Sequence, residues 1–139
     1  MVYRRKCNAR SLFVLCVGLI CSPGYLEASS LLDGMIFAGY NGEKGNKLDD
    51  KEKEEFIFEN GRFKSGSCGD YNFAAGKYIT ETIGNTVHFK AVTLSPTHGK
   101  IEWQGVVDGN KLDATFIWTK ERWYWDIHRE YWFSGVLKE

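Results

Sequence analysis

The residues best suited to acid–base chemistry lie near the C-terminal end of the chain, where Asp126, His128 and Glu130 alternate with other residues. A carboxylate beside an imidazole can act as a general base, and the three side chains together could bind a divalent metal ion. In an extended strand all three point to one side. Successive positions on that side are about 7 Å apart, which is too wide for three ligands to close round one ion. We therefore expect a solvated polar stripe here and no metal site.

Cys68 is the second candidate, and it lies in the small, polar stretch 65–71. A reactive thiol needs its pKa lowered by a cation, a helix N-terminus or a metal. The cations nearest in sequence are Lys64 and Lys77, and Asp70 would oppose ionisation. No histidine is placed nearby to activate the thiol. The pattern favours a structural, half-buried thiol over a nucleophile.

Sequence motifs that carry a catalytic mechanism are missing from the chain. It has no nucleophile elbow, no glycine loop that would cradle a phosphate and no zinc-ligand motif. An enzyme built on Cys68, or on His128 with its two neighbouring carboxylates, is therefore the least favoured hypothesis. We predict a protein with no enzymatic activity, no catalytic residues and no cofactor.

Aromatic residues are densest between Phe116 and Phe133, and they form the main candidate for a binding site. Large rings with polar tips suit the mouth of a barrel, where they can stack on an apolar ligand. Because neighbours in an extended chain point to opposite sides, Trp123, Tyr124 and Trp125 cannot all face inward, and exposed aromatic patches mark contact sites. The alternative is that these rings close the core. The residues predicted to contact a ligand are Trp118, Trp123, Tyr124, Trp125, Arg129 and Trp132.

Short segments rich in strand-forming residues fill the chain from residue 31 onward, and turn residues separate them at close intervals. Asn60-Gly61 supplies the positive φ that a tight hairpin turn needs. The segment 43–55, in which ten of thirteen residues are charged, is interpreted as a solvated loop or a short exposed helix. The pattern predicts strands over residues 31–40, 55–58, 62–65, 77–82, 86–94, 101–107, 112–118 and 131–138.

Short strands at even spacing are typical of an antiparallel sandwich or an up-and-down barrel. The barrel is favoured, because pairing 135–137 with 34–36 would remove two exposed edges. We predict an all-β fold, with one small antiparallel β-barrel domain of about eight strands over residues 29–139. Such a barrel is filled by side chains or holds one small ligand. The bulky residues expected to point inward, and to fill most of that space, are Phe63, Phe89, Trp103, Phe116 and Trp118.

Residues 1–28 are predicted to be a helical signal peptide. Basic residues between Arg4 and Arg10 precede an apolar run over 12–20 that is too short for a membrane anchor, and small residues within 24–30 suit cleavage. The general secretory route is favoured over a twin-arginine signal. A lipid-anchored Cys21 is the less favoured alternative, because the bulky Ile20 precedes it. We predict a secreted or periplasmic protein with no stable membrane span after cleavage.

Cleavage would change both the charge and the cysteine content. The whole chain has 18 basic and 18 acidic residues, and losing four basic residues and Glu27 leaves 14 against 17, a net charge of −3. A mildly acidic domain has no electrostatic footprint for nucleic acid, so we expect no nucleic-acid partner. Cys68 becomes the only cysteine, which excludes an internal disulfide. We predict a monomer, with a Cys68-linked dimer as the alternative.

Three stretches of the chain resemble a family of small exported bacterial proteins that are themselves uncharacterised: 31–37, 63–68 and Trp103-Gln104-Gly105. The resemblance covers most of the chain after the signal and implies a lipocalin-like, calycin-type β-barrel. It differs from the lipocalins proper, whose Gly-x-Trp signature would fall on Gly34-Met35-Ile36, where Ile36 stands in place of Trp.

The function predicted from these features is non-enzymatic binding of a small apolar or amphiphilic ligand outside the cytoplasm. Arg122 and Arg129 flank the aromatic run and would admit an anionic amphiphile. The alternative is an envelope protein-interaction or inhibitor module that uses its loops.

Overall fold

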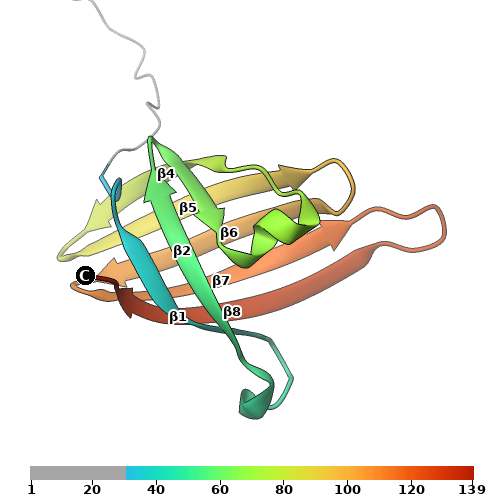
Figure 1. The fold of residues 1–139 in the computed structure, drawn as a ribbon, viewed down its shortest axis with the longest axis horizontal. Coiled ribbons are helices and arrows are strands. Elements are labelled where there is room, and N and C mark those ends of the chain that lie inside the picture. The colour runs from blue at the N-terminus through green and yellow to red at the C-terminus, as the bar shows by residue number, and fades with distance from the viewer. Residues whose placement is uncertain (1–30) are drawn as a thin grey trace, which may run out of the picture.

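The computed structural model describes residues 31–139 and places them in eight antiparallel strands that close into a barrel (Figure 1). The order of the strands round the barrel is their order along the chain. The predicted all-β, up-and-down barrel is therefore confirmed. The predictions for residues 1–28 lie outside the described residues. The strands are β1 Ile36–Glu43, β2 Glu52–Glu59, β3 Arg62–Ser65, β4 Gly76–Ile83, β5 Thr86–Ser95, β6 Gly99–Asp108, β7 Lys111–Lys120 and β8 Ile127–Leu137.

Pairing of β8 with β1 closes the barrel, as predicted, but in a different register. Gly135 lies opposite Gly39, and Leu137 lies opposite Phe37, so residues 34–36 are not the partners of 135–137. The reason is that β1 begins only at Ile36, after a turn over residues 31–34. A Cβ atom at Gly39 would lie 2.0 Å from the carbonyl oxygen of Ser134, so this close seam requires glycine there.

The charged segment 43–55 is only partly the loop that the sequence predicts. It contains a 3-10 helix, η1 Leu48–Asp50, but β2 already begins at Glu52. Glu54 is 5% exposed and shares the inward face of β2 with Phe56 and Phe58. Because the segment is so highly charged, the sequence prediction did not extend the alternation of Phe58 and Phe56 towards the N-terminus, to Glu54. The prediction of a solvated loop is wrong for residues 52–55.

The long hairpin of β7 and β8 also extends further than the sequence predicts. β8 begins at Ile127, which pairs with Lys120 at the end of β7, so residues 127–130 belong to the strand. The hairpin projects beyond the rest of the barrel (Figure 1).

The predicted turn at Asn60-Gly61 is confirmed, since both residues have positive φ, at 53° and 72°.

The middle of the barrel is filled by aromatic side chains. The rings of Phe56 and Phe133 stack with centroids 3.8 Å apart, and Phe58 packs edge-on against Tyr78 and Phe89. Edge-to-face and stacked contacts of this kind stabilise a core beyond the burial of apolar area alone. Four of the five residues predicted to point inward are buried: Phe63, Phe89, Trp103 and Phe116. Trp118, the fifth, is half-buried.

Candidate functional site

The end of the barrel at which β1 begins is closed by the turn over residues 31–34. Leu32 is 2% exposed and belongs to the core. Its backbone N–H donates to the Tyr78 hydroxyl at 3.2 Å, and that hydroxyl donates to Asp33 at 2.8 Å. Asp33 also accepts from the N–H of Gly61 at 2.9 Å. We call this the sealed end, because its apolar groups are packed and its polar groups are paired.

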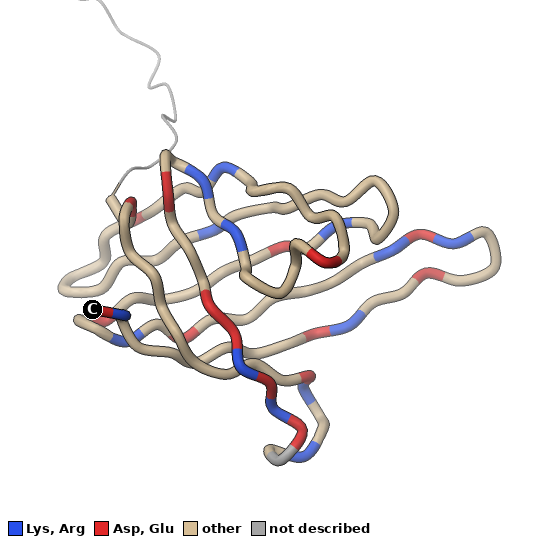
Figure 2. The backbone as a smooth tube through the Cα atoms, viewed as in Figure 1, with Lys and Arg blue, Asp and Glu red and all other residues tan. Residues whose placement is uncertain are grey.

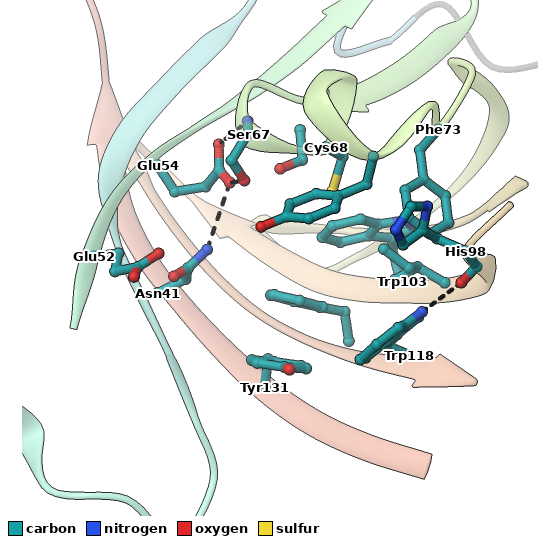
Figure 3. Close-up of a pocket in the computed structure, with 14 residues that line it drawn as sticks. Asn41, Glu52, Glu54, Ser67, Cys68, Phe73, His98, Trp103, Trp118 and Tyr131 are labelled. Carbon is teal, nitrogen blue, oxygen red and sulfur yellow. Dashed lines mark hydrogen bonds between the residues drawn. The ribbon is translucent and has the colours of Figure 1, made fainter. Parts of the chain in front are cut away.

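The opposite end of the barrel, which we call the open end, holds a cavity of about 270 Å³ (Figure 3). Aromatic side chains from β6, β7 and β8 form its floor, polar side chains from β1, β2 and β3 form one wall, and the short helix η2 Ser67–Tyr71 covers part of its mouth. The prediction that bulky side chains would fill most of the interior thus holds for the middle of the barrel and fails at this end.

The aromatic floor consists of three rings in contact. The Phe116 ring lies 4.4 Å from that of Trp103 and stacks on Tyr131 with centroids 4.9 Å apart and planes 9° apart. The indole N–H of Trp103 donates to the Thr93 hydroxyl at 2.8 Å. This buried hydrogen bond fixes the orientation of the Trp103 indole within the floor.

Trp118 forms the side of the cavity next to the floor. Its indole N–H donates to the backbone carbonyl of His98 at 2.6 Å, as Figure 3 shows. The His98 ring also borders the cavity and packs edge-on against Tyr71 of η2, with centroids 5.3 Å apart. The turn between β5 and β6 thereby holds both Trp118 and the end of η2 in place.

The polar wall centres on the buried carboxylate of Glu54. Oε1 accepts from the N–H of Glu55 at 2.7 Å and from the N–H of Ser67 at 3.2 Å. Oε2 accepts from the Ser67 hydroxyl and, at a longer 3.5 Å, from the amide of Asn41. All four donors are neutral groups. Among the ion pairs of residues 31–139, none involves Glu54.

The η2 segment is tied to the barrel at both of its ends. Before the helix, the N–H of Gly66 donates to the carbonyl of Glu55 at 2.9 Å. After it, Asn72 takes a left-handed conformation with φ of 61°, and the Ser95 hydroxyl donates to the carbonyl of Tyr71 at 2.8 Å. These anchors place the sulfur of Cys68 over the cavity, where Figure 3 shows it.

The thiol of Cys68 is free and half-buried, as the sequence predicts. Burial is the main cause that raises its pKa above the ordinary value of 9.0, and the negative charge of Glu54 adds to this. The hydroxyls of Ser65 and Ser67 act in the opposite direction but do not outweigh burial. A thiol with a raised pKa stays protonated at neutral pH and is a poor nucleophile.

Ser65 contributes a buried hydroxyl to the same wall. The residue is 4% exposed, and its side chain borders the cavity. The hydroxyl lies near enough to Cys68 to stabilise a thiolate there. When the thiol is protonated, the hydroxyl has no hydrogen-bond partner of normal geometry among the described residues. A buried polar group without a partner is uncommon in native proteins, and it marks a place where a ligand can bind.

The six residues predicted to contact a ligand are not brought together. Trp118 borders the cavity. Arg129 lies opposite Trp118 in the β7–β8 pair, at the rim, with its guanidinium 3.9 Å from Glu43. Trp132 follows the opposite parity to the buried Phe133, and its ring lies outside, against Gly42. The remaining three are in the exposed hairpin loop: Trp123, Tyr124 and Trp125, which are 94%, 47% and 63% exposed.

Sequence reasoning missed the polar half of the cavity. Counting back from the buried Phe58 and Phe56 in steps of two places Glu54 and Glu52 on the inner face, so the signal for these carboxylates was present. The same count from the buried Phe63 reaches Ser65, and from the buried Phe37 it reaches Asn41, so both have the parity of the inner face. Their roles depend on how η2 crosses the barrel end, which strand periodicity does not encode.

The polar stripe on β8 lies on the outside of the barrel. The side chains of His128 and Glu130 are well exposed, and His128 Nε2 is 3.8 Å from Glu130 Oε1. Across residues 31–139, no three His, Cys, Asp or Glu side chains are grouped so that they could hold a metal ion. The same part of the chain contains no helix with both the length and the apolar character needed to cross a membrane.

Comparisons with known proteins leave the chain without an assigned relative. No protein-family model matches it, and searches of curated proteins and of solved structures gave no significant match. Its closed barrel of eight antiparallel strands is consistent with a calycin-like fold on topology alone. The resemblance to a family of small exported proteins stays a prediction.

Proposed function

We propose that this protein is a non-enzymatic, extracytoplasmic binding protein that holds one small amphiphilic ligand in the cavity at the open end. The observation that carries the proposal is the contrast within the barrel. The interior is packed at the sealed end and hollow at the open end, where an aromatic floor meets a polar wall. An apolar surface with a few converging polar groups is the usual character of a small-molecule site.

The size of the cavity limits the ligand. A volume of about 270 Å³ lies just below the range of roughly 300–1,000 Å³ in which drug-sized molecules bind. The ligand therefore has an apolar body no larger than a single ring or a short chain. Fatty acids with long chains are too large to be enclosed.

The site is also preorganised. The indole rings of Trp103 and Trp118 are fixed by hydrogen bonds at 2.8 Å and 2.6 Å, and Glu54 is held by four donors. A rigid site loses little side-chain entropy when a ligand binds, which favours affinity in a small cavity.

Tryptophan fluorescence tests the proposal, because Trp103 and Trp118 border the cavity. The purified protein is titrated with hexanol, hexanoate, hexylamine, phenethyl alcohol, phenylacetate and phenethylamine. We expect at least one saturable change. Cys68→Phe should abolish it by filling the mouth, while a hairpin variant, Trp123→Ser with Trp125→Ser, should keep it. A flat response to the whole panel, or a response that follows the hairpin, would overturn the proposal.

The exposed hairpin loop favours a second candidate function, that of a protein-interaction or inhibitor module. The Tyr124 ring packs against both Trp123 and Trp125, and most of the Trp123 surface stays in solvent. Exposed aromatic clusters are typical of contact sites. Pull-downs from envelope extract with the wild type and the hairpin variant would test this. A stoichiometric partner recovered only by the wild type supports it, and recovery of no such partner contradicts it.

A further inference from the structure

The charged groups that border the cavity are nearly all of one sign. Glu52 and Glu54 of β2 lie in its wall. Among residues 31–139 no lysine or arginine borders the cavity, and His98 is the one basic side chain that does. Arg129 at the rim is already paired with Glu43. Along the backbone, residues of both charge signs follow one another on β2 and on the β7–β8 hairpin (Figure 2). An anion entering this cavity would meet two carboxylates and no counter-charge.

Glu54 is the group that most needs a ligand of opposite charge. It is 5% exposed, and its hydrogen bonds come only from neutral donors. Neutral donors orient a buried carboxylate but leave its charge without a partner, and buried charges in proteins are normally paired. The contact from Asn41 to Oε2 is long, at 3.5 Å, so a cationic donor in the cavity can take its place on this oxygen.

Ser65 gives independent evidence that a hydrogen-bonding ligand group enters here. Its hydroxyl is buried, borders the cavity and has no partner of normal geometry among the described residues. With the amide oxygen of Asn41 and with Oε2 of Glu54 it forms a wall rich in acceptors. An ammonium group has three donors and no acceptor, and it matches such a wall.

The aromatic floor fits the same ligand. The stacked rings of Phe116 and Tyr131, with Trp118 beside them, offer faces that attract a cation and repel an anion. The rings also provide an apolar surface for the body of the ligand. Charge, hydrogen bonding and ring electrostatics therefore select the same chemical class.

We infer that the cavity binds a small amphiphilic amine in its protonated form, with the ammonium group against Glu54 and Ser65 and the apolar body on the aromatic floor. The inference rests on the binding function proposed above and narrows it. It also replaces the anionic amphiphile that the sequence admitted. Arg122 lies on the hairpin beside Tyr124, at 3.2 Å from its hydroxyl, and Arg129 pairs with Glu43.

Matched probes test the inference directly. Hexylamine, hexanol and hexanoate share one apolar chain and differ only in the polar group. At neutral pH we expect hexylamine to bind roughly tenfold more tightly than hexanol, because a hydrogen bond to a charged group is stronger than a neutral one. Hexanoate should not bind measurably. The same order should hold for phenethylamine, phenethyl alcohol and phenylacetate.

The charge of Glu54 is tested by Glu54→Gln, which keeps the shape of the side chain. We expect this variant to lose the preference for hexylamine over hexanol while it still binds hexanol. Glu55→Gln is the matched control. It removes a carboxylate from the next position of β2, where Glu55 faces outward and pairs with Lys138 at 2.9 Å, and it should leave the preference unchanged.

The outcomes separate this inference from the proposed function. If hexanol or hexanoate binds the wild type as tightly as hexylamine, and Cys68→Phe abolishes that binding, the cavity binds ligands but the inference is overturned. If no probe binds, the proposed function itself is overturned. The order of the three probes on the wild type decides the inference even if Glu54→Gln fails to fold. Equal loss of preference in Glu54→Gln and Glu55→Gln would also contradict it.

Discussion

The sealed end and the open end of this barrel are built from the same strands with the same alternation, yet they use their polar groups differently. At the sealed end Asp33, Tyr78 and the backbone of Leu32 and Gly61 satisfy one another, and the side chains of Leu32 and Tyr78 are buried. At the open end Glu54 has only neutral partners and Ser65 has none of normal geometry among the described residues. Where polar groups satisfy one another, they stabilise the fold. Where they are left incomplete beside a cavity, they are available to a ligand.

The covering segments produce this difference. The turn over residues 31–34 inserts Leu32 into the interior. At the other end η2 carries mostly small or polar residues, and its Ser67, Cys68 and Tyr71 line the cavity without filling it. The strands provide a uniform tube, and the segments that cross its ends decide which end is filled.

Truncating a core ring that packs against Tyr78 of the sealed end should have the largest effect on stability. Phe58 is fully buried among other rings, so Phe58→Ala should lower the free energy of unfolding by about 3–5 kcal/mol. Phe73→Ala at the open end should cost only about 1–2 kcal/mol, because Phe73 is half-buried and borders the existing cavity. Urea denaturation of both variants measures the difference. Equal losses would show that the two ends do not differ in packing.

Removing one hydroxyl from the sealed end should have the next largest effect. Tyr78→Phe leaves the buried N–H of Leu32 without its acceptor and removes a donor to Asp33, at a cost of about 1–3 kcal/mol. Tyr131→Phe in the cavity floor should cost about 0.5 kcal/mol, because Tyr131 is only half-buried and borders the cavity. Thermal or urea unfolding distinguishes the two. A larger loss for Tyr131→Phe would reverse the assignment of paired and available polar groups.

The same deletion of a hydroxyl should be favourable at Ser65. Ser65→Ala removes a buried polar group that has no partner of normal geometry, so the free energy of unfolding should rise by about 1 kcal/mol. Ser95→Ala is the control. The Ser95 hydroxyl donates to Tyr71 and accepts from the N–H groups of Thr97 and His98, so its loss should destabilise the protein by about 1–2 kcal/mol. A destabilising Ser65→Ala would mean that this hydroxyl supports the fold.

The sequence predicted the barrel well because strand periodicity and turn residues encode it locally. The turn at Asn60-Gly61 follows directly from its residue types. The inward positions of Phe89 in β5 and Trp103 in β6 follow from the alternation within each strand. The cavity was harder to predict. Aromatic density correctly selected Trp118 as a residue that borders the cavity. It also selected Trp123 and Trp125, which are exposed, because residue type does not show where a hairpin extends past the end of a barrel.

The polar side depends on contacts distant in sequence. Glu54 is held by Ser67 and Asn41, each thirteen residues away, and the charges on either side of it in the sequence suggested a solvated loop. Alternation extended backwards from Phe56 would have placed Glu54 inside. The path of η2 across the barrel end, and with it the position of Ser65 beside the cavity, follows from tertiary contacts such as that of Ser95 with Tyr71.

Cys68 offers the finest comparison, because its pKa and that of Tyr78 are both raised above their ordinary values, mainly by burial. Since the folded-state pKa of the thiol lies above its unfolded value, the stability it contributes is fully present below pH 9.0 and is lost as the pH rises through the folded value. The free energy of unfolding should therefore begin to fall just above pH 9. Cys68→Ala should remove this first part of the decline, and the tyrosines should leave a decline at higher pH in both proteins.

The rate of alkylation by iodoacetamide also tests the raised pKa of the Cys68 thiol. At pH 8 the thiol of the folded protein should react more slowly than the same thiol in urea, because the thiolate is the reactive form and burial disfavours it. Because Cys68 lies over the cavity of the open end, a bound ligand should also change this rate. Hexylamine in the cavity should slow the reaction further in the wild type, and Glu54→Gln should need a higher hexylamine concentration for the same effect, because the ammonium group has lost its counter-charge. Folded and unfolded rates that are equal would show that the thiol lies in solvent and that η2 does not hold it over the cavity.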